Sequence, residues 1–385
     1  MPGKTDRIRA IFCISLFIFK VGSSLAFQPY DVQNPYTSLD STQLDSVIRI
    51  TAIKYQKHPA NPLLIKKLAE AFTVKKEIDS AGIYWLKLAE IQPQNDTAWY
   101  RHAMLVYGTG KFESAYASLQ QSLNIHPDRI DYLSLSAMIA YRLHNEDTSM
   151  VLCRRILSLD PQNINALLFS GIILRNQKNN EDALIQFDKC LKADPANTDA
   201  LMHRAEIYVF LRKYNDALRD YSAARADLST NPDVINNIGI CYYQSGSYQK
   251  AITFFKKGIF INSLHPQSNF NKGLSYYKLN DFDTASVDIK AASAIWDTCY
   301  SDTCHANFLD ALYYLGLCYK NIGDLPAAKS HFELLQKEGY ARDLTPEIKH
   351  IEYALFISRN WYYIAAVFVL FIALIISVIR AARKR

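Results

Sequence analysis

Apolar side chains recur along this chain with a period of about 34 residues. Small residues hold one phase of the period, at Ala81, Ala115, Ser149, Ala183, Ala217, Ala251 and Ala285. A large apolar side chain follows four positions later, at Trp85, Leu119, Phe187, Tyr221, Phe255 and Ile289. Residues four apart share one face of an α-helix, so this pattern predicts an amphipathic helix in each repeat.

Each repeat is expected to contain another helix, which precedes the amphipathic helix just described. Another small residue stands twelve positions earlier, at Ala69, Ala103, Ala137, Gly171, Ala205, Gly239 and Gly273. Small residues let two antiparallel helices approach closely, and neighbouring helical pairs bury each other's apolar faces. The sequence therefore predicts eight helical hairpins over residues 62–340. They begin near Pro62, Asp96, Ile130, Ile164, Thr198, Pro232, Pro266 and Leu309.

The last hairpin carries the fullest set of repeat residues, namely Leu312, Leu315, Gly316, Tyr319, Ala328 and Phe332. Prolines also recur at the same interval, at Pro93, Pro127, Pro161 and Pro195. Together these residues make a pattern that resembles the tetratricopeptide repeat. The resemblance implies an all-α, right-handed helical-repeat solenoid whose first helices line a concave groove. The third unit departs from the family pattern, because Ser149 and Cys153 stand where Ala and an aromatic residue are usual.

Three segments of the body lie outside the regular repeats. Residues 27–61 are expected to cap the first unit with one helical face, made of Leu44, Val47, Ile48, Ala52 and Tyr55. Nine surplus residues between the last two units predict an inserted loop at about 296–308. Residues 341–358 are expected to form a capping and linking helix, since Thr345-Pro346-Glu347 is typical of a helix start.

Both ends of the chain carry signals for a membrane. Residues 1–26 read as a signal peptide, with a basic start, an apolar run and small residues before a cleavage site after Ala26. An uncleaved anchor or a buried helix is the alternative. Residues 361–379 are apolar and long enough for one transmembrane helix. The basic tail at 380–385 is then expected in the cytoplasm and the repeats outside it, with a bacterial periplasm as the expected compartment.

The positive net charge of the chain comes from its two terminal segments and not from the repeats. The whole chain carries +6, of which residues 1–26 contribute +3 and residues 380–385 contribute +4. Residues 27–379 are left with −1, so the repeats present no overall positive charge to a phosphate backbone. Nucleic acid is therefore not expected as a partner. The 49% content of hydrophobic residues also excludes a disordered chain.

Aromatic residues dominate the positions that would face the groove. Positions five, nine, twelve and thirteen of the units supply the predicted partner-binding residues Tyr100, Met104, Tyr107, Met138, Tyr141, Arg142, Arg175, Met202, Asn236, Tyr243, Phe270, Tyr277, Lys278 and Tyr313. Tyrosine, methionine and arginine are enriched in protein interfaces. The alternative is that several of these rings pack one repeat against the next.

The sequence offers little that indicates catalysis, a cofactor or a metal. It contains no H-E-x-x-H and no G-x-S-x-G motif. Cys299 and Cys304 form the candidate disulfide, with free thiols as the alternative, and a metal site using His305 would lack a fourth ligand. Cys153, Cys190, Cys241 and Cys318 fall at helix-seam phases, where a small buried apolar residue is expected.

These observations favour a non-enzymatic scaffold that is exported, held by one C-terminal helix, and binds a protein or peptide in the groove. A basic tail of six residues leaves signalling across the bilayer to a complex with another membrane protein. Three alternatives stay open. They are a glycan-binding envelope protein, an enzyme built on the Cys299–His305 loop, and a tail-anchored cytosolic adaptor that would keep residues 1–26.

Overall fold

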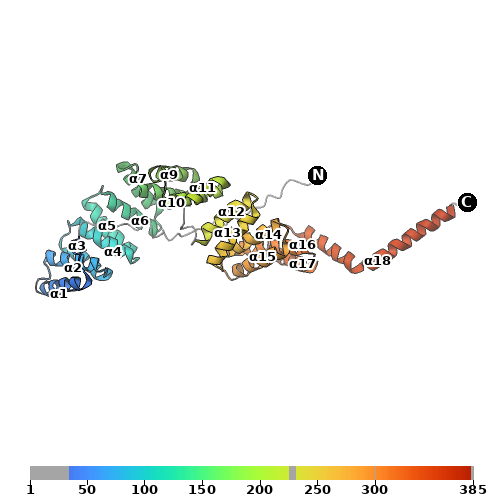
Figure 1. Ribbon diagram of the computed structural model, residues 1–385, viewed down its shortest axis with the longest axis horizontal. Coiled ribbons are helices and arrows are strands. Elements are labelled where there is room, and N and C mark those ends of the chain that lie inside the picture. The colour runs from blue at the N-terminus through green and yellow to red at the C-terminus, as the bar shows by residue number, and fades with distance from the viewer. Residues whose placement is uncertain (1–33, 225–230, 300, 383–385) are drawn as a thin grey trace. The chain divides into compact units, whose positions relative to one another are not determined.

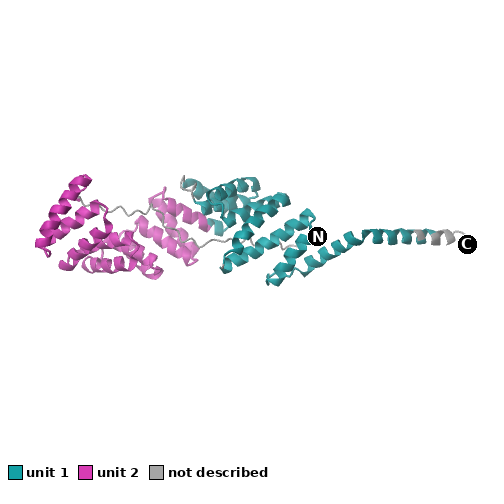
Figure 2. Ribbon diagram, turned by 90° about the horizontal axis from the view of Figure 1, so that it is seen from below, with its two compact units in different colours: residues 1–15, 208–385 teal, residues 16–207 magenta. Residues whose placement is uncertain are grey.

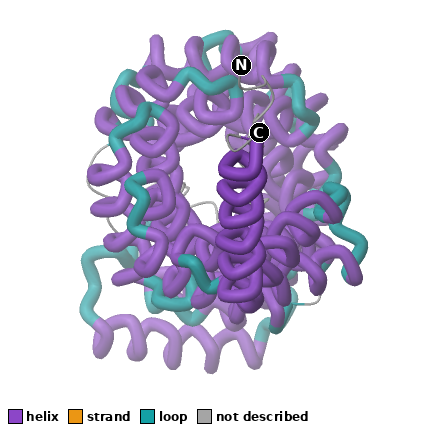
Figure 3. Tube along the Cα trace, turned by 90° about the vertical axis from the view of Figure 1, so that its right-hand side faces the viewer, coloured by secondary structure: helices purple, strands orange, loops and turns teal. Residues whose placement is uncertain are grey.

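The structure is a computed structural model that describes residues 34–224, 231–299 and 301–382. These residues form helices and connecting loops, and no strand occurs among them (Figure 3). Figure 1 labels the helices in chain order. They are α1 (Ser41–Lys57), α2 (Pro62–Val74), α3 (Ile78–Ile91), α4 (Asp96–Gly108), α5 (Phe112–Ile125), α6 (Ile130–Arg142), α7 (Glu146–Leu159), α8 (Ile164–Asn176), α9 (Asn180–Ala193), α10 (Thr198–Phe210), α11 (Tyr214–Ala223), α12 (Pro232–Gln244), α13 (Tyr248–Ile261), α14 (Pro266–Lys278), α15 (Phe282–Asp297), α16 (Asp302–Ile322), α17 (Leu325–Lys337) and α18 (Thr345–Ala382).

The first helices of seven repeats begin at the predicted residues, from Pro62 in α2 to Pro266 in α14. Side chains just before them explain why. Asn95 and Asn163 each accept a hydrogen bond from a backbone N–H of the first turn, which satisfies a donor that the helix itself leaves free. Asn61 adds the same cap in front of a proline, whose fixed φ suits a helix start. The all-α repeat architecture is thus confirmed.

The turn inside each repeat contains one residue in the left-handed region. The angle φ is 62° at Lys76 and 63° at Lys178, and glycine takes the same place at Gly110 and Gly246. His144, Arg212 and Asn280 complete the series. These positions follow the interval of the repeat, so the repeat imposes this backbone conformation even where a side chain makes it unfavourable.

Of the described residues, 34–207 form one compact unit, and those from 208 to 382 form the other (Figure 2). We call them the N-terminal unit and the C-terminal unit. Each has its own apolar core. In the N-terminal unit the side chains of Leu119 and Tyr132 are fully buried, and in the C-terminal unit those of Phe255 and Phe332 are.

The surplus residues near 296–308 do not form a loop, which corrects the sequence prediction. They lengthen two helices instead: α15 has 16 residues where a regular second helix such as α13 has 14, and α16 has 21 where a regular first helix such as α14 has 13. The helix that contains the predicted start of the eighth unit, Leu309, therefore begins seven residues earlier, at Asp302. Phe308 packs against the core of the C-terminal unit, so burial of an apolar side chain favours helix here.

Helices α1 and α18 pack against the first and the last repeat and bury apolar surface that would otherwise be exposed. In α1 the side chains of Leu44 and Thr51 are buried, while Asp40 and Gln43 form a capping box. The linking helix and the apolar run after it are one continuous helix, α18. Its segment Thr345–Ile376 is long and apolar enough to cross a membrane. The predicted signal at 1–26 and residues 383–385 of the basic tail lie outside the described residues.

Candidate functional site

In the C-terminal unit, the first helices of consecutive repeats lie beside one another, with α12 against α14 and α14 against α16. We call the side formed by these first helices the inner face. Aromatic side chains meet there around Tyr314. Its ring centroid lies 5.8 Å from that of Phe270, 5.9 Å from Tyr277 and 5.6 Å from Tyr313. We call these four residues the ring cluster.

Each ring of the cluster is half-buried, so part of it remains open to solvent. Edge-to-face contacts hold three of the rings at interplanar angles of 71° to 78° about Tyr314. Burial, with the phenols of Tyr314 and Tyr248 nearby, raises the pKa of Tyr243 on the neighbouring helix α12. The phenol of Tyr243 therefore stays protonated at neutral pH and presents a neutral hydroxyl group.

Contacts behind the ring cluster also give it a packing role. Phe270 touches Trp296 of α15 at 5.3 Å between centroids, and Tyr277 touches Phe282 at the same distance. These two contacts lie within one hairpin, whereas the contacts of Phe270 and Tyr277 with Tyr314 of α16 join two repeats. The alternative of repeat-to-repeat packing therefore applies to part of each of these rings. Tyr314 was not among the residues predicted from the sequence, because it lies one position after the fifth residue of its unit, outside the positions expected to face the groove.

The last repeat closes over one end of the ring cluster. Tyr340 stacks on Tyr313 with 5.7 Å between ring centroids, and the guanidinium group of Arg342 lies 5.3 Å from the centroid of the same ring. Tyr340 donates a hydrogen bond of 2.8 Å to Asp310 Oδ1. Burial raises the pKa of Asp310, and the bond from Tyr340 offsets only part of that rise. Part of the Tyr313 ring is therefore covered by Tyr340 and Arg342.

In the N-terminal unit we likewise call the side formed by the first helices its inner face, and polar side chains of α6, α8 and α10 meet there. Arg175 of α8 forms an ion pair with Glu206 of α10, and His203 Nδ1 lies 3.2 Å from the same carboxylate oxygen. Asn176 donates hydrogen bonds to Tyr141 Oη at 3.2 Å and to Glu146 at 2.8 Å. Three first helices, α6, α8 and α10, are connected in this way. We call these residues the polar cluster.

Glu206 keeps its charge although its surroundings are largely closed to water. Burial alone would raise the pKa of this carboxyl, but hydrogen bonds and charge from His203 and Arg175 hold the pKa below its ordinary value. Arg175 was among the residues predicted from the sequence, and both of its partners were missed. The sequence does contain a pattern that indicates this pair: His203 and Glu206 are three residues apart on one helix and are therefore neighbours on its surface.

Four of the predicted groove residues are buried and do not contribute to an open surface. These are Tyr100, Met138, Met202 and Asn236, each at most 9% exposed. Tyr100 packs on Tyr132 with 4.6 Å between ring centroids, and Asn236 accepts a hydrogen bond from Asn271 at 3.1 Å. The expectation of an open position is wrong for these four, because the repeat period fixes the helix face but not the depth of each side chain.

The other predicted groove residues are half-buried on the first helices. Tyr107 and Tyr141 each touch one ring at their edge, Phe112 at 5.6 Å and Phe169 at 5.9 Å between centroids. The remaining half-buried residues are Met104, Arg142, Tyr243 and Lys278. These side chains can contact a partner without leaving their places in the fold.

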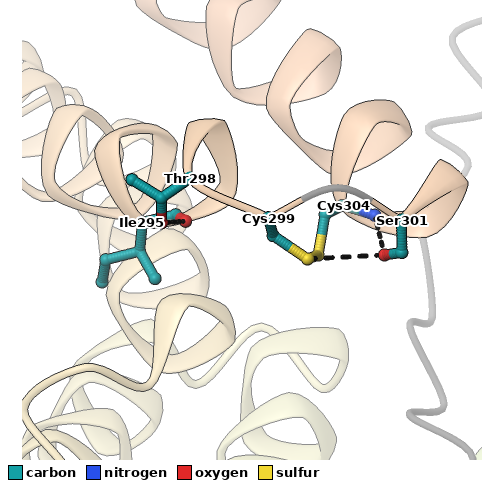
Figure 4. The surroundings of a disulfide bond; sticks show 5 residues. All are labelled: Ile295, Thr298, Cys299, Ser301 and Cys304. Carbon is teal, nitrogen blue, oxygen red and sulfur yellow. Dashed lines mark hydrogen bonds between the residues drawn. A yellow bond between two sulfur atoms is a disulfide. The ribbon is translucent and has the colours of Figure 1, made fainter.

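Cys299 and Cys304 are joined by a disulfide at the junction of α15 and α16 (Figure 4). The two Cα atoms are 5.8 Å apart, and Ser301 caps α16 by accepting a hydrogen bond from the Cys304 N–H. Cys153, Cys190, Cys241 and Cys318 are buried free thiols. Burial raises the pKa of Cys153 and Cys190 to about 11. Among the described residues no group of three or more His, Cys, Asp or Glu side chains could hold a metal ion.

Comparison with known families agrees with this geometry. Three models described as tetratricopeptide repeat match residues 164–197, 202–269 and 310–340. The chain carries tetratricopeptide repeats. Proteins with tetratricopeptide repeats are generally non-catalytic scaffolds that bind peptides or proteins.

Solved tetratricopeptide structures share the fold at low sequence identity. One is the C-terminal part of a repeat-containing protein from Cytophaga hutchinsonii, at 14% identity and a TM-score of 0.50, with 63% of this chain and 96% of that chain covered. Another is a repeat protein from Parabacteroides merdae, at 16% identity and a TM-score of 0.49, with 65% and 98% covered. No curated protein is significantly similar to this sequence.

Proposed function

We propose that this chain is a non-enzymatic scaffold that is exported, is anchored by the apolar part of α18, and binds a protein or peptide on the inner faces of its units. The ring cluster carries the proposal. Phe270, Tyr277 and Tyr314 come from two different helices and each leaves part of its ring open. Rigid amphipathic rings of this kind give a large contact area at a small cost in side-chain entropy.

Charge on the inner faces supports a protein partner over a phosphate-rich one. Arg175 is neutralised by Glu206, and Arg342 lies 3.2 Å from Glu347. Both guanidinium groups are therefore engaged inside the chain. Tyrosine hydroxyls, ring faces and the half-buried cations Arg142 and Lys278 are the groups left for a partner, and this mixture suits a peptide backbone and its side chains.

The compartment is inferred from three features together. The apolar run in α18 supplies one membrane span, the basic residues after it favour a cytoplasmic tail, and the Cys299–Cys304 disulfide suits an oxidising environment. We therefore propose that the repeats lie outside the cytoplasm, in a bacterial periplasm. N-terminal sequencing of the mature protein tests this assignment. A start at Phe27 supports export, whereas a start at Met1 contradicts it and favours a tail-anchored protein.

The ring cluster is tested by quantitative pull-down of the full chain from detergent-solubilised membranes, in three variants. We expect Tyr277→Ala and Tyr314→Ala to lose the captured partner about tenfold or more, since each removes a ring that contributes about 1.4 kcal/mol or more to binding. Phe260→Ala is the matched control, because Phe260 is 92% exposed and lies on α13 away from the cluster. If the tyrosine variants lower the melting temperature but still capture the partner, the rings only pack repeats and the proposal fails.

A further inference from the structure

Two opposite stripes run along the first half of α18. One stripe packs on the last repeat, where Ile348 is 8% exposed and Ile351 is fully buried. The other stripe carries Tyr353, Phe356 and Ile357, which are 64%, 59% and 38% exposed. At 3.6 residues per turn, the two stripes lie about 180° apart. The capping helix is therefore apolar on the face that it turns away from the repeats.

An apolar outer face is unusual for a helix that only caps a solenoid. Such a helix normally carries polar side chains opposite its buried stripe. Exposed apolar patches on proteins mark surfaces that meet a membrane or another protein. Polar side chains do occur in this segment. Lys349 and His350 are exposed at the N-terminal end of the outward face, whereas Glu352 and Arg359 lie on a flank of the helix, and Glu352 pairs with Lys329 at 2.8 Å.

The outer stripe continues into the apolar run without interruption by a charged residue. Positions 353, 356, 357, 360, 361 and 364 share one helix face, and five of them are aromatic or aliphatic. Trp361 is 50% exposed, and Tyr362 and Tyr363 beside it are 70% and 76% exposed. One turn before Tyr353, the exposed Lys349 lies on the same face. Along this face, Lys349 is followed by the aromatic side chains of Tyr353, Phe356 and Trp361, and then by the aliphatic side chain of Ile364.

We infer that the outer stripe of α18, formed by Tyr353, Phe356 and Ile357, binds the phospholipid headgroup layer beside the membrane span. The inference rests on the proposed anchoring, and it adds that the capping half of α18 is itself a lipid contact. Aromatic rings prefer this layer, and a lysine at its outer edge meets lipid phosphates.

The length of the stripe defines how α18 meets the bilayer. Tyr353 and Trp361 are separated by eight residues, or about 12 Å of helix. Each headgroup layer is only about 5–8 Å thick. Tyr353 and Trp361 can both lie in one layer only if this part of the helix is oblique to the membrane normal. An oblique helix has one face toward lipid and one toward water, as the opposite stripes of this segment require.

Photo-crosslinking of the full-length protein in its native membrane tests this inference. The photoreactive residue p-benzoylphenylalanine replaces Tyr353 or Phe356 in separate variants, which keeps an aromatic side chain at each site. Irradiation should attach phospholipid at both sites, detected by mass spectrometry. The matched control places the same residue at Phe260, which is more exposed than Phe356 but lies on α13, and it should give no lipid adduct.

A fourth variant separates this inference from the anchoring on which it rests. It carries the photoreactive residue at Phe368, in the middle of the apolar run. Lipid adducts at Phe368 with protein adducts, or no adducts, at positions 353 and 356 overturn the headgroup contact and leave the anchor intact. Loss of lipid adducts at Phe368 as well overturns both. Lipid adducts at Phe260 would show that exposure alone causes labelling, which also overturns the inference.

Discussion

The phenyl ring of Phe187 occupies the space that a side chain at Gly171 would need. A β-carbon built on Gly171 would lie 2.6 Å from Cε1 of Phe187. The same relationship recurs in other units, with Gly239 against Phe255 at 2.4 Å. The ring of the second helix thus lies directly on the backbone of the first, and this contact explains why the repeat alternates small and large side chains.

Replacing Gly171 by alanine should therefore destabilise the N-terminal unit. The added methyl group cannot fit unless the buried ring or a helix shifts, which we expect to lower the free energy of unfolding by about 1–3 kcal/mol. Gly108→Ala is the control in the same unit. Gly108 is also helical, but a β-carbon there meets no atom within 4 Å, so that variant should be neutral or more stable by up to about 1 kcal/mol. Urea titration of both variants checks the difference, and equal stabilities would refute the close contact.

The ion pair between Glu206 and Arg175 should make stability depend on pH. The pKa of Glu206 is lowered in the folded protein, so its charged form is favoured by folding. This contribution is complete well above the ordinary value of 4.5 and is lost as the pH falls through the lower folded value. Glu206→Gln should cost about 2 kcal/mol at pH 7, because it leaves Arg175 without its counter-charge.

The difference between wild type and Glu206→Gln should then shrink in acid. Denaturant titrations at pH 7 and at successive values below 4.5 measure it. Glu181→Gln serves as the control, since Glu181 is an exposed residue of α9 in the same unit and should change stability little at any of these pH values. A constant difference across the range would mean that Glu206 acts through packing and not through its charge.

Alkylation of the cysteines should divide them into two classes. Without reductant, iodoacetamide should leave Cys299 and Cys304 unmodified because they are disulfide-bonded, and reduction should expose both. The buried thiols should stay unmodified in either case, since burial raises the pKa of Cys241 and Cys318 to about 12 and the thiolate is the reactive form. Peptide mass spectrometry reads each site. Modification of both Cys299 and Cys304 in unreduced native protein would exclude the disulfide.

Much of the fold could be predicted because small and large side chains recur at the same positions in each repeat and pack in the same way. Seven first helices begin at the expected residues, since small and large side chains mark the seam and asparagines mark several starts. The eighth unit matches the family from residue 310, but the helix that contains its start was expected to begin at Leu309 and begins at Asp302. Residues 302–308 lie outside the period, and their helix is stabilised by the packing of Cys304 and Phe308 against the core and by the cap from Ser301.

The candidate site was less predictable, because the repeat period determines which helix face a side chain lies on but not how far the side chain is buried. Tyr100 and Tyr107 both fall on the predicted face, yet Tyr100 is 5% exposed and Tyr107 is half-buried. What separates them is a neighbour on the next repeat, Tyr132, which covers Tyr100. Tyr314 is the opposite case: the repeat pattern did not predict it as a groove residue, yet the rings of Phe270, Tyr277 and Tyr313 all contact it.

The unbroken course of α18 has a geometric consequence for the last repeat. Successive residues of an α-helix are rotated by about 100° around the helix axis and displaced by about 1.5 Å along it. Inserting one residue between Ile351 and Trp361 would therefore swing the final hairpin around the helix by more than a quarter of a circle while lifting it very little. The number of residues between Ile351 and Trp361 thus determines the rotation of the last repeat about the axis of the apolar run.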